Sequence, residues 1–190
     1  MKPSILALVI CSFFSTVTFS KVPELSVTTD SKFSITTTDV ASKLEDTLLQ
    51  TEGFLKRFNP ADAVVKKRVI SGNNFDYIVE KKFLGISTEA EMIGTLYFER
   101  VATGCLPTEN AYLGTFEFTG EQVIVDHIEN FKMLVCSLEK NSTTINIRTK
   151  NTLNYKGDKL SYIAEKFVVG VIKDQVQAMN EAMKAEVLSR

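Results

Sequence analysis

The sequence predicts an α+β protein in which helices cover one face of a single antiparallel sheet. Residues 63–155 form a run of strand-like segments joined by short connections, which favours antiparallel pairing between neighbours. Residues 158–190 have the apolar spacing of one long amphipathic helix, and its apolar stripe needs a large apolar partner. The preceding sheet is the only large candidate, so the two observations together predict an α+β layer architecture.

The N-terminus has the features of a secretory signal. Lys2 precedes a short apolar run at residues 5–14, and Thr18 and Ser20 are small residues at the positions required for cleavage after Ser20. The apolar run is too short to span a bilayer comfortably. We therefore predict a signal peptide at residues 1–20, a secreted or periplasmic mature protein and no stable transmembrane anchor. An uncleaved membrane anchor is the alternative.

The first part of the mature chain is expected to contain one strand and two short helices. Residues 21–31 are polar and predict an extended lead-in, so the folded domain is expected at residues 32–190. Residues 32–38 alternate in polarity, as a strand does. Asp39 is then predicted as the N-cap of a helix that Gly53 breaks, with a further short helical turn before Asn59.

Strand patterns follow Pro60 without interruption. A polar stretch at residues 126–130 disturbs the alternation of the fifth of these strands, residues 123–138, and predicts a bulge or bend there. Turn residues at 156–158 then lead into the long helix. The six predicted strands lie at residues 63–70, 75–84, 88–101, 112–119, 123–138 and 143–155.

This order of elements, with Gly170 in the middle of the last helix, resembles the helix-grip fold of the START-like (SRPBCC) superfamily. That superfamily includes lipid-transfer START domains, pollen-allergen relatives and polyketide cyclase-like proteins. The resemblance covers residues 32–190 and depends on element order, since no catalytic motif is shared. It implies a strongly curved seven-stranded sheet wrapped around the long helix, with an elongated apolar cavity for a lipid-like or polyketide-like ligand between them.

Seven apolar residues are the candidates for lining such a cavity. A glycine inside a helix costs about 1 kcal/mol relative to alanine, which is tolerable if a ligand or a bulky sheet residue must approach the backbone at Gly170. A packed core with the same composition is the alternative for all seven. The candidates are Phe167, Gly170, Val171 and Met179 on the helix, and Tyr97, Phe116 and Phe131 on strands.

Two cysteines remain in the mature chain, Cys105 and Cys136, and an even number in an exported protein permits one disulfide. If residues 112–119 and 123–138 form a hairpin about Gly120, opposed residues have numbers that add up to about 240. The residue numbers of Cys105 and Cys136 add up to 241, which places both cysteines at the same end of the sheet. A disulfide and two buried free thiols both fit this placement.

Catalytic chemistry has few candidates. His127 is the only histidine and could act as a general base oriented by Asp126, although consecutive strand residues point to opposite faces. Three carboxylates lie on predicted strands: Glu91, Glu99 and Glu117. If they faced a dry cavity, their pKa values would rise and they could act as acids, whereas on the solvent side of the sheet they would not. A single histidine without a Cys/His cluster predicts no metal site, and no cofactor-binding motif is present.

Composition limits the function further. The chain has 190 residues, of which 44% are hydrophobic and 24% charged, with a formal net charge of -1. These values fit one globular domain, and the near-neutral charge argues against nucleic acid as a partner. We expect an exported, monomeric, non-enzymatic protein that binds a small apolar or amphipathic ligand. The alternatives are a cyclase- or dehydratase-type enzyme using the same cavity, and a protein-interaction module with a filled core.

Overall fold

Seven antiparallel strands form one sheet in the computed structural model, which describes residues 25–83, 86–119, 128–155 and 162–190. The strand order is β1-β7-β6-β5-β4-β3-β2, so the first strand of the chain pairs with the last. The strands are β1 (Leu25–Thr36), β2 (Ala63–Ser71), β3 (Asn74–Phe83), β4 (Ile86–Arg100), β5 (Asn110–Thr119), β6 (Ile128–Asn141) and β7 (Thr144–Tyr155).

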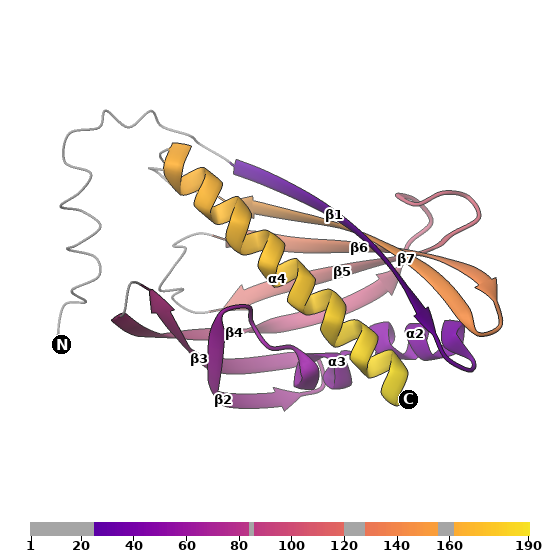
Figure 1. The fold of residues 1–190 in the computed structure, drawn as a ribbon, viewed down its shortest axis with the longest axis horizontal. Coiled ribbons are helices and arrows are strands. Elements are labelled where there is room, and N and C mark those ends of the chain that lie inside the picture. The colour runs from indigo at the N-terminus through magenta and orange to yellow at the C-terminus, as the bar shows by residue number, and fades with distance from the viewer. Residues whose placement is uncertain (1–24, 84–85, 120–127, 156–161) are drawn as a thin grey trace.

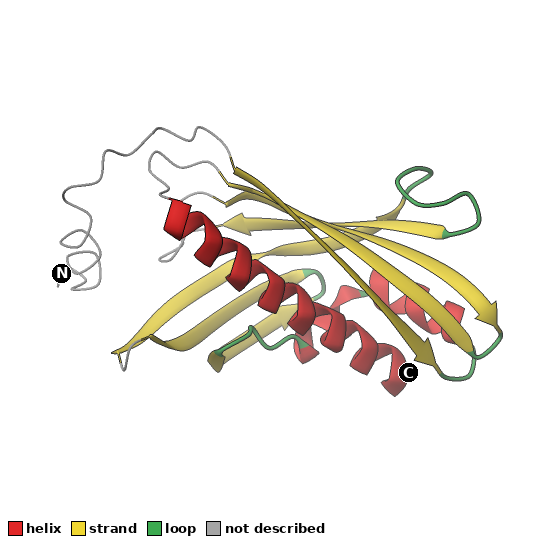
Figure 2. Cartoon of the chain, turned by 45° about the horizontal axis from the view of Figure 1, so that its top comes forward, coloured by secondary structure: helices red, strands yellow, loops and turns green. Residues whose placement is uncertain are grey.

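In the described part of the chain, three helices lie on one side of this sheet. They are α2 (Val40–Leu49), α3 (Thr51–Arg57) and α4 (Tyr162–Ser189). Figure 1 shows α4 crossing the sheet diagonally, with α2 and α3 near its C-terminal end. Figure 2 shows that the sheet bends strongly and that α4 lies on its hollow side. The predicted α+β helix-grip architecture, with two short helices after the first strand, is therefore confirmed.

The first strand begins earlier than the sequence predicts. Residues 25–31, expected as part of a lead-in, pair with β7 from Leu25↔Tyr155 onward. The prediction was wrong because this stretch is rich in polar residues, yet Val27 and Thr29 are buried on its inner face. Residues 1–24, with the predicted signal peptide at 1–20, lie outside the described residues. Among the helices that the structure describes, none combines the length and apolar content that crossing a bilayer requires.

The start of α2 and its boundary with α3 also differ from the prediction. Asp39 occupies the N-cap position, but its backbone is left-handed, with φ 51°, and its side chain makes no capping hydrogen bond. The break between the helices falls at Gln50, and Gly53 lies inside α3. Gly53 therefore does not end the helix, and its lack of a side chain serves packing instead.

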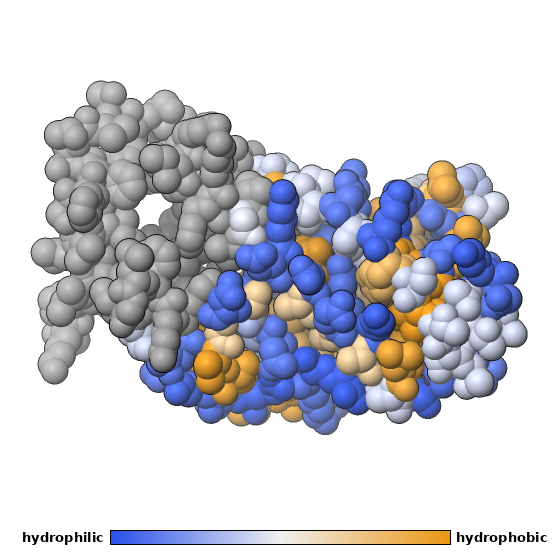
Figure 3. Space-filling view, viewed as in Figure 1, coloured by the Kyte–Doolittle hydropathy of each residue, from blue (hydrophilic) through white to orange (hydrophobic). Residues whose placement is uncertain are grey.

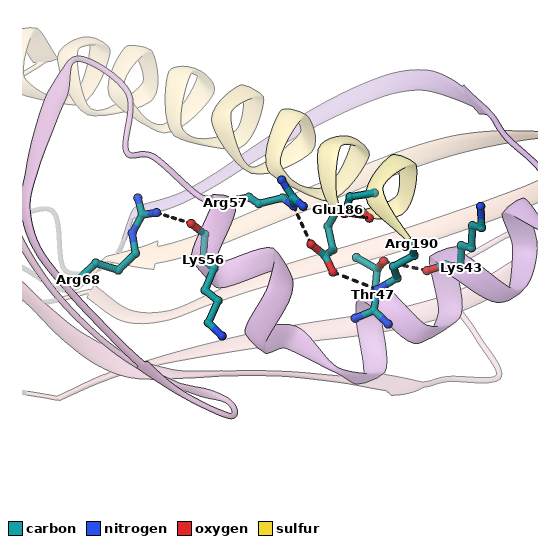
Figure 4. A network of polar contacts seen from close by, with 8 residues as sticks. Lys43, Thr47, Lys56, Arg57, Arg68, Glu186 and Arg190 are labelled. Atoms are coloured by element: carbon teal, nitrogen blue, oxygen red, sulfur yellow. Dashed lines mark hydrogen bonds and ion pairs between the residues drawn. The ribbon is translucent and has the colours of Figure 1, made fainter.

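Gly53 makes room for a buried carboxylate of α4. A Cβ atom at Gly53 would lie 2.2 Å from Oε1 of Glu186. The Glu186 carboxylate accepts hydrogen bonds from Nε of Arg57 at 2.7 Å and from Nε of Arg190 at 3.0 Å. Figure 4 shows Glu186 between these two arginines, where α3 and the end of α4 meet. A buried carboxylate needs such partners, so this cluster fixes the C-terminal end of α4 against α3.

The C-terminal half of α4 is packed tightly. Met183 and Val187 are fully buried, and Met179 is nearly so. The helix approaches α3, α2 and β1 most closely among the described elements. Lys173 and Glu181, on the other face, are exposed. Figure 3 shows hydrophilic residues over most of the visible surface, with hydrophobic ones in separate groups. The amphipathic pattern predicted for this part of the helix is confirmed.

Candidate functional site

Four phenylalanine rings form a continuous wall on the inner face of the sheet, which we call the aromatic wall. It consists of Phe75 on β3, Phe116 and Phe118 on β5, and Phe131 on β6. Successive ring centroids lie 6.1 Å (Phe75 and Phe118), 6.4 Å (Phe118 and Phe116) and 5.1 Å (Phe116 and Phe131) apart. Strand alternation places them on one face, because Phe116 pairs with Phe131 and Gly94 pairs with both Phe75 and Phe118.

The structure brings together only some of the residues predicted to line a cavity. Phe116 and Phe131 belong to the aromatic wall, and Met179 of α4 is buried on the same side of the sheet. Tyr97 lies on the opposite face, where it is 38% exposed and its hydroxyl donates to Glu117 at 3.3 Å. Its neighbours in β4, Leu96 and Phe98, occupy the inner positions instead.

The structure says less about four other candidate residues. The side chains of Phe167 and Val171 lie outside what is described of α4, and His127 lies outside the described residues. Gly170 is exposed, and a Cβ atom added there would meet nothing within 4 Å. No bulky sheet residue therefore requires a glycine at this position in the described part of the chain.

Replacing Gly170 with alanine should raise the free energy of unfolding by about 1 kcal/mol, because alanine is the better helix former and the added methyl group has free space. Urea unfolding monitored by circular dichroism measures this directly. A fall in stability would contradict the open surroundings of Gly170. Unchanged stability with weaker ligand binding would instead indicate a ligand that approaches the helix backbone there.

The strand carboxylates are not candidates for acid–base catalysis on the inner face. Glu91, Glu99 and Glu117 are all exposed, which is the solvent-side alternative that the sequence left open. Glu109 is partly buried in the loop before β5. Burial favours a raised pKa for Glu109, but hydrogen bonds from the Leu106 N–H and from Arg148 outweigh it and lower the pKa. Glu109 is therefore a structural anion.

A group of buried or partly buried polar side chains lies beneath α4, and the sequence analysis did not identify it. The group consists of Thr29 and Ser31 on β1, Thr149 and Asn151 on β7, and Asn180 on α4. Asn180 Nδ2 donates to Ser31 Oγ at 2.7 Å, and the hydroxyls of Ser31 and Thr149 are 2.7 Å apart. Two of its atoms, Thr29 Oγ1 and Asn151 Oδ1, have no hydrogen-bond partner among the described residues. The only sequence signal was alternation continuing backward from Phe33 into the stretch expected as a lead-in.

Cys105 and Cys136 form a disulfide, with their Cα atoms 5.6 Å apart. The register that predicted their approach was wrong, because Cys136 pairs with Ala111 and Cys105 lies in the loop before β5. The bond fixes this loop against β6. The loop also lines a surface pocket of about 330 Å³, formed by residues 101–107 with Glu109 and Ala111 and separate from the residues of the aromatic wall.

A bent, seven-stranded antiparallel sheet that holds a long C-terminal helix on its hollow face, with two short helices after the first strand, defines the START-like helix-grip fold. No sequence family matches the chain, and no curated protein does. Solved structures do match it in fold.

One such structure is the ZhuI aromatase/cyclase from Streptomyces sp. R1128, with a TM-score of 0.51 and 10% sequence identity over 87% of this chain and 96% of that one. Another is truncated norcoclaurine synthase from Thalictrum flavum, with a TM-score of 0.51 and 11% identity over 90% of this chain and 99% of that one. A conserved protein from Geobacillus kaustophilus has a TM-score of 0.50 and 13% identity over 86% and 96% of the two chains. At these identities the likeness establishes the fold alone.

Proposed function

We propose that this protein is exported and binds a small apolar or amphipathic molecule between α4 and the inner face of the sheet, without changing it chemically. The observation that supports this most is the aromatic wall, a continuous apolar surface on the side of the sheet that α4 covers. Ligand sites for such molecules are mostly apolar with a few polar groups that fix orientation. The described inner face has both.

Export is supported by two independent features. Residues 1–20 have the composition of a signal peptide. The Cys105–Cys136 disulfide is of the kind that persists in oxidising compartments. Mass spectrometry of the protein from its source should find a mature chain that begins at Lys21.

Single-tryptophan variants test where the ligand binds, because the natural chain contains no tryptophan. Phe118→Trp places the reporter in the aromatic wall, and Tyr97→Trp places it on the opposite face as a matched control. The probe is 11-bromo-1-undecanol, whose bromine quenches indole fluorescence only at close range. We expect saturable quenching of the Phe118→Trp variant and little quenching of the Tyr97→Trp variant.

Equal quenching of the two variants, or none in either, would count against a site on the inner face. Native mass spectrometry of protein purified from its source gives a second test, since the proposal predicts a co-purifying apolar mass. Repeated absence of any such mass, together with no quenching by the probe, would end the proposal.

An enzyme is the second candidate, because two of the similar structures are described as an aromatase/cyclase and a norcoclaurine synthase. However, the three strand carboxylates considered for this role, Glu91, Glu99 and Glu117, are exposed. His127 remains the candidate acid–base group for this alternative. Loss of a cyclase- or dehydratase-type activity in a His127→Gln variant would favour the enzyme, and full activity in that variant would remove the assignment.

A further inference from the structure

A closed ring of hydrogen bonds joins α4 to the adjoining strands β1 and β7, and it determines which way a neighbouring amide faces. Asn180 Nδ2 donates to Ser31 Oγ at 2.7 Å, and Thr149 Oγ1 donates to Asn180 Oδ1 at 3.4 Å. When the single proton of the Thr149 hydroxyl goes to Asn180 Oδ1, Ser31 is the donor in the 2.7 Å bond between the two hydroxyls. The ring thus uses the only proton of Thr149.

Asn151 must therefore direct its amide nitrogen toward Thr149. Nδ2 of Asn151 lies 3.4 Å from Thr149 Oγ1, which has no second proton to offer to an oxygen. The carbonyl oxygen of Asn151 then points away from Thr149. This oxygen has no hydrogen-bond partner among the described residues, although Asn151 is only 1% exposed.

Thr29 provides a second such atom beside it. Thr29 is the residue directly opposite Asn151 in the pairing of β1 with β7, and it is 8% exposed. Its Oγ1 also lacks a partner in the described part of the chain. Buried polar atoms are nearly always hydrogen-bonded, so two unpartnered ones on opposed residues indicate a place that receives a polar group from elsewhere.

The surroundings of this pair are apolar. Val27 and Leu153 form the next inward-facing pair along β1 and β7, and Leu153 in turn pairs with Phe131 of the aromatic wall. Met133 lies opposite Asn151 on β6 and is fully buried. The neighbours in sequence, Asp30 and Lys150, are exposed on the other face of the sheet.

We propose that Thr29 and Asn151 bind the hydroxyl group of a neutral, otherwise apolar ligand whose body lies along the aromatic wall. This inference depends on the function proposed above and specifies its ligand class. The ligand hydroxyl donates its proton to Asn151 Oδ1 and accepts the proton of Thr29 Oγ1, so both buried atoms gain a partner.

Charged groups fit this pair less well. A carboxylate or phosphate would place its negative charge against the carbonyl oxygen of Asn151. An ammonium group would be buried with no carboxylate among the described inward-facing neighbours, and an unpaired buried charge is strongly unfavourable. A hydroxyl satisfies one acceptor and one donor without bringing a charge.

The test compares two probes of nearly the same shape, 2-naphthol and 2-methylnaphthalene, which differ by a hydroxyl in place of a methyl group. Their dissociation constants are measured by probe fluorescence on the full mature protein, and the ratio of the two constants is compared between variants. Thr29→Val removes the unpartnered hydroxyl at nearly constant volume and leaves the hydrogen-bond ring intact. Thr28→Val, one residue earlier and exposed on the opposite face, is the matched control.

We expect Thr29→Val to weaken binding of 2-naphthol about tenfold relative to 2-methylnaphthalene, which corresponds to the loss of one hydrogen bond. Thr28→Val should leave the ratio of the two dissociation constants unchanged. Because ratios are compared between variants, the different solubilities of the probes cancel. Binding of both probes with an unchanged ratio in Thr29→Val overturns this inference and leaves the proposed function standing. A crystal structure of the 2-naphthol complex with only water at Thr29 and Asn151 has the same consequence. Binding of neither probe overturns both proposals.

Discussion

Replacing Tyr77 with alanine should lower the free energy of unfolding by about 3 to 5 kcal/mol, the range measured when large buried aromatic side chains are truncated. Tyr77 is 1% exposed and is among the largest fully buried side chains in the described structure. Denaturant unfolding followed by circular dichroism measures the change. A loss below about 1 kcal/mol would show that the site collapses freely around the missing ring.

The expected loss of stability is large because Tyr77 connects α3 to the inner face of the sheet. Its ring lies 6.2 Å from that of Phe58 and 5.5 Å from that of Phe75, which begins the aromatic wall. The guanidinium of Arg68 is 5.5 Å from the ring centroid, and the Tyr77 hydroxyl donates to the carbonyl oxygen of Leu55 at 2.6 Å. Truncation therefore leaves a cavity and also removes a hydrogen bond.

The variant Tyr77→Phe separates these two contributions and should cost only about 1 kcal/mol. It should also remove a dependence on pH. Burial raises the pKa of Tyr77 to about 12, whereas the unfolded chain titrates near its usual value of about 10. Between these values the unfolded state loses the proton first, so stability falls as pH rises through this interval. Native protein should lose more stability there than Tyr77→Phe, and equal losses would contradict the raised pKa.

The order and type of the elements could be predicted because they depend on patterns local in sequence. Alternation identified the strands after Pro60, and helical spacing identified α2 and most of α4. A strand in which most residues are polar on both faces gives only a weak signal of this kind. Residues 25–31 were therefore missed, because their place in the sheet depends on pairing with β7, far away in the sequence.

The face of the sheet on which each side chain lies, and the register between strands, were less predictable. Tyr97 and Phe98 alternate in sequence, and only the position of α4 decides that Phe98 faces inward and Tyr97 outward. The β5–β6 pairing places Phe116 opposite Phe131. Opposed residue numbers add up to 247 in this pairing rather than to about 240, so the register differs from the predicted one. The cysteines still meet, because the loop before β5 reaches β6.

The polar part of the candidate site could not have been found from sequence. Thr29 and Asn151 are ordinary strand residues until the β1–β7 pairing sets them opposite each other, and their unpartnered atoms are apparent only once the hydrogen-bond ring is known. The aromatic wall was partly predicted, through Phe116 and Phe131, because inward-facing aromatic residues on strands are common in any core. Phe75 and Phe118 complete it through the sheet's register.

Loss of the Cys105–Cys136 disulfide should lower the free energy of unfolding by about 3 to 4 kcal/mol, because the bond closes a loop with a sequence separation of 31 residues in the unfolded chain. The suitable variant combines Cys105→Ser with Cys136→Ala, since Cys136 is buried and a hydroxyl there would lack a partner. Urea unfolding with and without a reductant measures the effect. Reductant should destabilise the native protein and leave the double variant unchanged.

The same double variant separates stability from ligand binding. The disulfide fixes the loop before β5 at the end of the sheet where Ala111 pairs with Cys136, whereas the aromatic wall continues from Phe116 toward the other end of β5. When Phe118→Trp is added, quenching by 11-bromo-1-undecanol should therefore persist under conditions where the protein remains folded. Stability that is the same with and without the bond would contradict the loop-closure argument, and loss of quenching in the folded variant would place the ligand at this loop instead.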